Sequence, residues 1–164
     1  MDIIKISDLI GQQIEEIRFL YTPETHEKYS IQSCYTFIKL SNKRIVKIPL
    51  FYSDDFIIMS PENISYFQNS FENGSKITHN AAKLIFGETI VDILFNYRGN
   101  EWDDFPPFIK LTNGYYLSEV QYAPNGIPVG PILFDEEKFQ KEKQRRAGIG
   151  IDIWSYSFNK DKLQ

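Results

Sequence analysis

The sequence predicts a mixed α+β fold built mainly of antiparallel strands, on the basis of three observations. Aromatic residues make up 15% of the chain, with 13 Phe and 10 Tyr, and these residue types favour the pleated, half-buried surface of a sheet. Several short segments alternate apolar and polar residues with the period of a strand. One segment near the C-terminus instead has the capping residue and charge distribution of a helix. We expect residues 1–164 to form a single compact domain.

An internal repeat runs through the first three quarters of the chain. Residues 9–21 read LIGQQIEEIRFLY and residues 85–97 read IFGETIVDILFNY, with glycine, two isoleucines, phenylalanine and tyrosine in the same places. Residues 37–42, FIKLSN, recur as residues 108–113, FIKLTN. Matching blocks in the same order indicate duplication of one supersecondary unit. The alternative is convergence, since hairpins reuse these residue types. We assign a first unit to residues 7–52 and a second to residues 82–122.

Each unit is predicted to be a helix end followed by strands. Gly11 and Gly87 follow short apolar segments, where glycine adopts the left-handed conformation that ends a helix. Asn42 and Asn113 mark the turns between strands. The expected strands cover residues 17–21, 37–40 and 44–51 in the first unit, and residues 93–97, 108–111 and 115–122 in the second.

The rest of the chain is predicted from its turn and cap signals. A helical turn is expected from Ser60 and a short helix at 79–86, leading into the second unit. Residues 124–131 contain three prolines and predict a rigid turn. The C-terminal segment 135–156 is expected to hold a charged helix, capped by Asp135 and running to about residue 146, and a final edge strand at 149–154. The last few residues are expected to fray.

Charge and composition restrict the classes of function. The net charge is −4, whereas nucleic-acid binding needs a clustered basic face, so we expect no nucleic-acid partner. The basic run Lys141–Arg146 alternates with acidic and neutral residues, which is typical of a solvated helix face. No secretory signal or membrane-length apolar run occurs, so we expect a cytoplasmic protein without a membrane partner.

Residues that could support catalysis or metal binding lack suitable neighbours in the sequence. Cys34 is the only cysteine, which excludes an intramolecular disulfide, and it precedes a strand-like segment where cysteine is usually a small buried hydrophobe. His26 and His79 have no second histidine at metal-ligand spacing. No nucleotide-binding or nucleophile motif is present. The sequence therefore favours a non-catalytic chain with no metal and no cofactor.

The acidic and aromatic loop that follows the long strand of the second unit is the most distinctive surface segment. Trp102 stands beside the doublet Asp103 and Asp104, and a second acidic doublet occurs at Asp54 and Asp55. Aromatic residues at the centre of an interface and charges at its rim favour tight and fast association. We predict that these five residues bind a protein partner, for which a basic surface would be complementary. The alternative is a solvated hairpin loop.

The second unit also carries a family resemblance, in the stretch Leu111–Val120. With the chain's size, mild acidity and aromatic content, this stretch resembles small bacterial domains, among them the immunity proteins that neutralise polymorphic toxins. The resemblance implies an inhibitor that binds a toxin or enzyme, and it transfers no individual functional residue.

Two further hypotheses remain open at this point. One is a small-molecule-binding protein or enzyme with a pocket between the two units. Its lining residues would be Tyr97, Tyr115, Glu119 and Tyr122. The other is a homo-oligomer that pairs through the edge strand at 149–154.

Overall fold

The computed structural model describes residues 2–22, 33–48, 56–59, 75–76, 83–99, 101–102, 107–122 and 128–159 of the chain. These residues form a mixed α+β structure of antiparallel strands with a C-terminal helix and a final strand, as the sequence predicts. The longer strands belong to two separate sheets, a division that the sequence did not predict. A separate short pair joins β1 (Asp2–Lys5) to β5 (Phe56–Met59).

The first sheet has the strand order β4-β3-β2-β6. Its longer strands are β2 (Ile14–Thr22), β3 (Ser33–Leu40) and β4 (Ile45–Ile48), and β6 (Ser75–Lys76) is a two-residue addition beside β2. A tight turn joins β3 to β4, where the N–H of Leu40 donates to the carbonyl of Arg44 at 2.9 Å. A four-residue helix, α1 (Ile6–Leu9), precedes β2.

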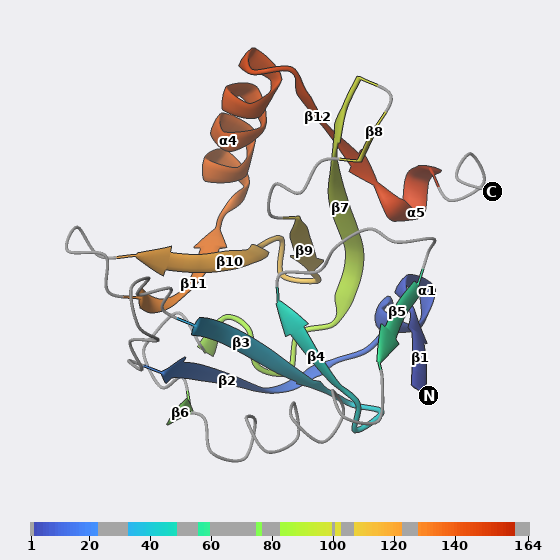
Figure 1. Ribbon diagram of the computed structural model, residues 1–164, viewed down its shortest axis with the longest axis vertical. Coiled ribbons are helices and arrows are strands. Elements are labelled where there is room, and N and C mark those ends of the chain that lie inside the picture. The colour runs from blue at the N-terminus through green and yellow to red at the C-terminus, as the bar shows by residue number, and fades with distance from the viewer. Residues whose placement is uncertain are drawn as a thin grey trace.

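The second sheet has the strand order β11-β10-β9-β7-β12, and β8 pairs with the end of β7 beside this path. The C-terminal helix lies between the last two strands in the chain, and a final short helix follows the last strand. The bounds are β7 (Ile90–Arg98), β8 (Glu101–Trp102), β9 (Phe108–Leu111), β10 (Tyr116–Tyr122), β11 (Pro128–Phe134), α4 (Glu136–Gly148), β12 (Ile151–Ser155) and α5 (Tyr156–Asn159). In Figure 1 the sheet of β2, β3 and β4 lies below that of β7, β9 and β10, with α4 at the top.

Several backbone features occur once in each sheet, at matching positions. The turn asparagine accepts a hydrogen bond from the N–H two residues later: Asn42 from Arg44 (3.0 Å) and Asn113 from Tyr115 (3.1 Å). The long central strand has a bulge near its start: between Ile14 and Glu16 in β2, and between Ile90 and Asp92 in β7.

Gly11 and Gly87 lie at the seam between the two sheets, with φ of 91° and 80°. The N–H of Gly11 donates to the carbonyl of Ile90, and the N–H of Gly87 donates to the carbonyl of Ile14, both at 2.8 Å. The two isoleucines donate their own N–H groups to the residues that follow the opposite glycine, both at 2.9 Å. These reciprocal bonds need a backbone conformation that glycine reaches without steric cost.

The main core lies between the sheets and is built from residues at matching positions. Six such pairs are fully buried: Leu9 and Ile85, Ile14 and Ile90, Ile17 and Ile93, Ile38 and Ile109, Leu40 and Leu111, and Val46 and Leu117. Because these apolar residues come from both halves, each sheet buries its inner face against the other.

Helix α4 covers the other face of the second sheet. Phe139 of α4 stacks on the ring of Tyr116 at 3.8 Å between centroids and meets the ring of Phe108 edge-on at 5.1 Å. As predicted, Asp135 caps the helix, since its side chain accepts from the N–H of Lys138 at 2.8 Å. The middle of the second sheet is therefore buried on both faces.

Two C-terminal segments differ from the prediction. Pro128–Pro131, expected to be part of a turn, begin the edge strand β11, which pairs with β10 across two register shifts. Proline is accepted at a sheet edge, because its missing N–H need not join a ladder. After the final strand, Tyr156–Asn159 form a short helix, α5, that the sequence did not predict, and residues 160–164 lie outside the described residues. The helical turn expected from Ser60 lies outside the described residues, and residues 84–87, at the described end of the short helix expected at 79–86, form a turn.

Candidate functional site

The outer edge of the second sheet carries the two most exposed large apolar side chains of the described residues. Ile149, just before β12, is 47% exposed, and Phe158, in α5 just after it, is 80% exposed. Within the described part of the chain, β12 pairs with β7 only and so ends the sheet. We call β12 together with Ile149 and Phe158 the β12 edge.

Asp92 of β7 ties the backbone beside Phe158 to the sheet. Its carboxylate accepts from the hydroxyl of Ser155 and from the N–H of Ser157, the latter at 2.9 Å. The N–H of Phe158 in turn donates to the Ser155 hydroxyl oxygen at 3.1 Å. The exposed Phe158 ring therefore projects from a backbone that is held by three hydrogen bonds.

Aromatic rings also pack along this part of the sheet. The rings of Tyr97 and Trp154 lie 5.1 Å apart between centroids, tilted by 39°. Trp102, from the predicted partner-binding set, pairs through its backbone with Tyr97. It therefore lies across β7 from β12. The four acidic members of that set, Asp54, Asp55, Asp103 and Asp104, lie outside the described residues.

The residues predicted to line a pocket between the units are spread along the second sheet. Tyr97 lies near the end of β7, whereas Tyr115 precedes β10 and bonds through its carbonyl to Leu111, the partner of Ile90 at the start of β7. Ile90 and Tyr97 are seven residues apart along β7, which is a distance of roughly 23 Å in a strand. Glu119 and Tyr122 lie on β10. The pairing thus keeps Tyr97 and Tyr115 apart.

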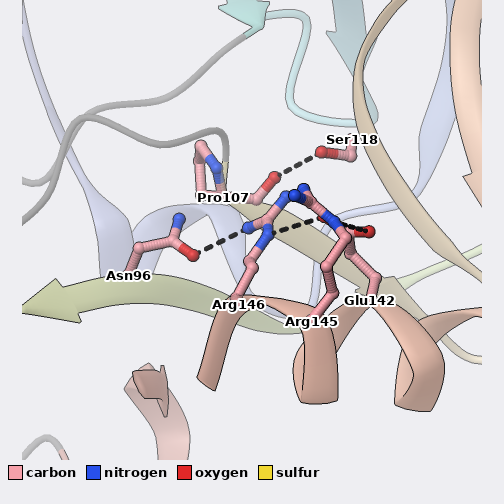
Figure 2. A network of polar contacts seen from close by, with 6 residues as sticks. All are labelled: Asn96, Pro107, Ser118, Glu142, Arg145 and Arg146. Carbon is pink, nitrogen blue, oxygen red and sulfur yellow. Dashed lines mark hydrogen bonds and ion pairs between the residues drawn. The ribbon is translucent and has the colours of Figure 1, made fainter. Parts of the chain in front are cut away.

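A buried polar network holds α4 to the second sheet (Figure 2). Arg146 is 3% exposed, and its guanidinium lies over the ring of Phe108 at 4.3 Å from the centroid. It donates to the side-chain oxygen of Asn96 at 2.7 Å and to the carboxylate of Glu142 at 3.0 Å. The prediction of a solvated basic face is therefore wrong for Arg146, because an arginine can be buried when its donors are matched.

Glu142 of α4 and Tyr116 of β10 have shifted pKa values. Hydrogen bonds from Arg145, and then from Arg146, hold the pKa of Glu142 below its usual value against an opposing effect of burial. Burial, followed by a hydrogen bond to Glu136 at 2.8 Å, raises the pKa of the Tyr116 hydroxyl. Tyr116 therefore remains a protonated donor at neutral pH. The bond from Tyr116 to Glu136 links α4 to β10.

A polar hollow opens beside α1 in the first unit, with a volume of about 510 Å³. It is bordered by α1, by the segment leading into β2 and by the turn between β3 and β4. Its lining residues are Ser7, Asp8, Ile10, Gln12, Asn42 and Arg44. The sequence did not predict this hollow, although its residues lie at the helix end and at the turn that the repeat identifies.

The other residues considered for chemistry are only partly placed. Cys34 lies in β3, with its backbone opposite Tyr21, in the predicted strand setting. His26 and His79 lie outside the described residues. Among the residues that are described, no group of three or more His, Cys, Asp or Glu could hold a metal ion. None of the described helices is long and apolar enough to cross a membrane.

Comparison with known proteins identifies no relative of this chain. No family model matches the chain, and no curated protein or solved structure matches it.

Proposed function

We propose that this chain is a non-catalytic protein-binding module that acts as immunity proteins do, by binding and inhibiting a toxin or enzyme. The observation that carries the proposal is the β12 edge, where the Phe158 side chain is 80% exposed and its backbone is held by hydrogen bonds. Exposed aromatic side chains on a fixed scaffold are the residues that dominate binding energy in protein interfaces. Addition of a strand to the edge of a sheet is also a recurring mode of protein recognition.

Charge adds to the case for a protein partner. Asp103 and Asp104 directly follow Trp102 in the sequence, and the chain as a whole carries a net charge of −4. Acidic groups near an aromatic patch accelerate the approach of a basic partner and exclude acidic ones. We therefore propose a partner with a basic surface, which meets the β12 edge and the Trp102–Asp104 segment together.

The test is affinity capture followed by measurement of the dissociation constant with the purified partner. Tagged chain is incubated with lysate of its source cells, and a protein captured in stoichiometric amount is then produced by recombinant expression. We expect Phe158→Ala, and separately the Trp102→Ala/Asp103→Ala pair, each to weaken its binding by about tenfold or more. If the partner is an enzyme, equimolar chain should suppress its activity.

Leu84→Ala is the matched control for this experiment. Leu84 is an exposed apolar residue, 38% accessible, at the other end of β7, so its truncation should leave binding unchanged. The proposal fails if no stoichiometric partner is captured, or if partner binding is insensitive to both the Phe158 and the Trp102/Asp103 variants. Light scattering on the purified chain tests pairing of two copies through β12, which would show as a dimer.

Small-molecule binding is the second candidate function, and the polar hollow of the first unit is the observation that favours it. This hollow differs in place and lining from the pocket between the units that the sequence suggested. A ligand site there would be compatible with partner binding at β12.

We further infer that the chain consists of two copies of one helix-plus-hairpin unit. The matched turn bonds, the matched bulges and the paired core residues support this inference. Convergent hairpins would share turn chemistry, but they would have no reason to share the bulge position and the reciprocal glycine bonds.

A further inference from the structure

Two amide side chains line the hollow of the first unit, and hydrogen bonds to their oxygens fix their orientation. The side-chain oxygen of Gln12 accepts from the hydroxyl of Ser41 at 2.7 Å and from the N–H of Asn42 at 3.1 Å. The side-chain oxygen of Asn42 accepts from the N–H of Arg44 at 3.0 Å. Because both oxygens are occupied by donors, the amide NH₂ groups are the ends left to meet a ligand.

The remaining polar groups make the hollow rich in donors. Arg44 contributes a guanidinium, which carries five N–H donors. Ser7 contributes a hydroxyl. Asp8 is the acidic residue of the lining, and one of its oxygens already accepts from the N–H of Lys5 at 3.2 Å. One positive and one negative side chain therefore line the hollow, with neutral donors between them.

Apart from the turn asparagine, the matching positions of the second unit carry other side chains, and a hydrogen bond bridges them. They carry Lys83, Leu84, Phe86, Glu88, Asn113 and Tyr115. There the amide nitrogen of Asn113 donates to the carbonyl of Leu84 at 2.7 Å and so links the turn after β9 to the turn at residues 84–87. In the described part of the first unit, the amide nitrogen of Asn42 makes no such bond. Among the described residues, the turn asparagine therefore donates from its side-chain nitrogen in the second unit and not in the first.

We propose that this hollow binds a small carboxylic acid that carries an adjacent donor group, such as an α-amino or α-hydroxy acid. The carboxylate would accept from the amide groups of Gln12 and Asn42 and from the guanidinium of Arg44. Asp8 would accept from the ammonium or hydroxyl group of the ligand. A doubly charged phosphate is disfavoured, because Asp8 would repel it across the same hollow. This site is independent of the β12 edge.

The test is a titration of the isotope-labelled chain, followed by nuclear magnetic resonance. The probes are free α-amino and α-hydroxy acids, each compared with its carboxamide. We expect at least one acid to shift the amide signals of Gln12 and Asn42, with its carboxamide binding about tenfold more weakly or not at all. Asn42→Asp and Gln12→Glu should each weaken binding by about tenfold, because a carboxylate replaces a donor.

Both variants preserve the fold by design. Each keeps the oxygen that accepts the internal hydrogen bonds, and Glu88 in the second unit already accepts from Thr112 at the position matching Gln12. Glu88→Gln is the matched control and should leave binding unchanged. The proposal is overturned if no acid shifts these signals at about 10 mM, if the carboxamides bind as tightly as the acids, or if Asn42→Asp and Gln12→Glu bind like the wild type.

Discussion

Arg146 is the residue on which the packing of α4 depends most. It is 3% exposed, it stacks on Phe108 and it satisfies the side-chain oxygen of Asn96, which is itself only 1% exposed. Arg145, the residue before it on the helix, is exposed and forms an ion pair with Glu142 at 2.6 Å. Two adjacent arginines thus have opposite roles, because the helix turns one of them towards the sheet.

Replacing Arg146 should reveal this difference in chemical denaturation. We expect Arg146→Met to lower the free energy of unfolding by about 2–4 kcal/mol, because Asn96 loses its buried donor. Adding Asn96→Leu should recover part of that loss, since both polar partners are then gone. Arg145→Met should cost less than about 1 kcal/mol. Equal losses for the two single variants would contradict a specific role for Arg146.

Glu142 gives the same network a dependence on pH. Its pKa in the folded chain lies below the ordinary value of 4.5, chiefly because of Arg145. The unfolded chain therefore takes up this proton at a higher pH than the folded chain does. The stability that Glu142 contributes is fully present above about pH 5 and is lost as the pH falls through the folded-state pKa.

Glu142→Gln removes this titration without a change of shape. We expect the wild type to exceed this variant in stability at about pH 7, and the difference to shrink at about pH 3. Urea denaturation of both proteins at the two pH values measures it. A difference that stays constant with pH would show that the charge of Glu142 is not involved.

At the scale of elements, α4 was foreseeable and β11 was not. A helix cap is a local arrangement: Asp135, the acidic first turn and the basic last turn lie within one segment. The strand at Pro128–Phe134 depends instead on a neighbour, β10, that supplies hydrogen bonds along one side. Local signals for a turn were overridden there by pairing at a sheet edge.

The cap itself offers a direct prediction for α4. Asp135→Ala should lower the free energy of unfolding by about 1 kcal/mol, because the N–H of Lys138 loses its acceptor. Asp135→Asn should cost less, since an amide oxygen can replace the carboxylate oxygen. Thermal unfolding followed by circular dichroism would compare the three proteins, and an Asn variant no better than Ala would argue against the cap.

At the scale of the whole molecule, the seam at Gly11 and Gly87 joins the two sheets. Both glycines have positive φ, and a Cβ at either would meet no atom within 4 Å. The cost of an alanine there is thus conformational and not steric. The four reciprocal hydrogen bonds at the seam link the halves of the shared core.

Alanine at the seam should therefore be costly even though space is available. We expect Gly11→Ala and Gly87→Ala each to lower the free energy of unfolding by about 1–2 kcal/mol. Gly148→Ala, in the last turn of α4, should be neutral or slightly stabilising. Urea denaturation measures all three, and a neutral Gly87→Ala would contradict the need for glycine at this seam.

Much of the fold could be predicted from the sequence, because its signals are periodic and local. The alternating pattern around Ile17 and Ile93 and the cap at Asp135 reflect forces that act within a few residues. The candidate sites could not be predicted in the same way. The exposure of Phe158 depends on where Asp92 ties α5, and the hollow depends on the approach of Asn42 to Gln12.

The sequence by itself determined the α+β class, the charged C-terminal helix and the strands whose residues alternate. Only the tertiary structure decided that Arg146 is buried, that Pro128–Phe134 form a strand, and which apolar side chains remain exposed at β12. The physical reason is that a hydrophobic period reports which face of an element is buried, whereas the burial of one polar group depends on partners far away in the chain. Arg146 and Asn96 are 50 positions apart, and only folding brings them within hydrogen-bond distance.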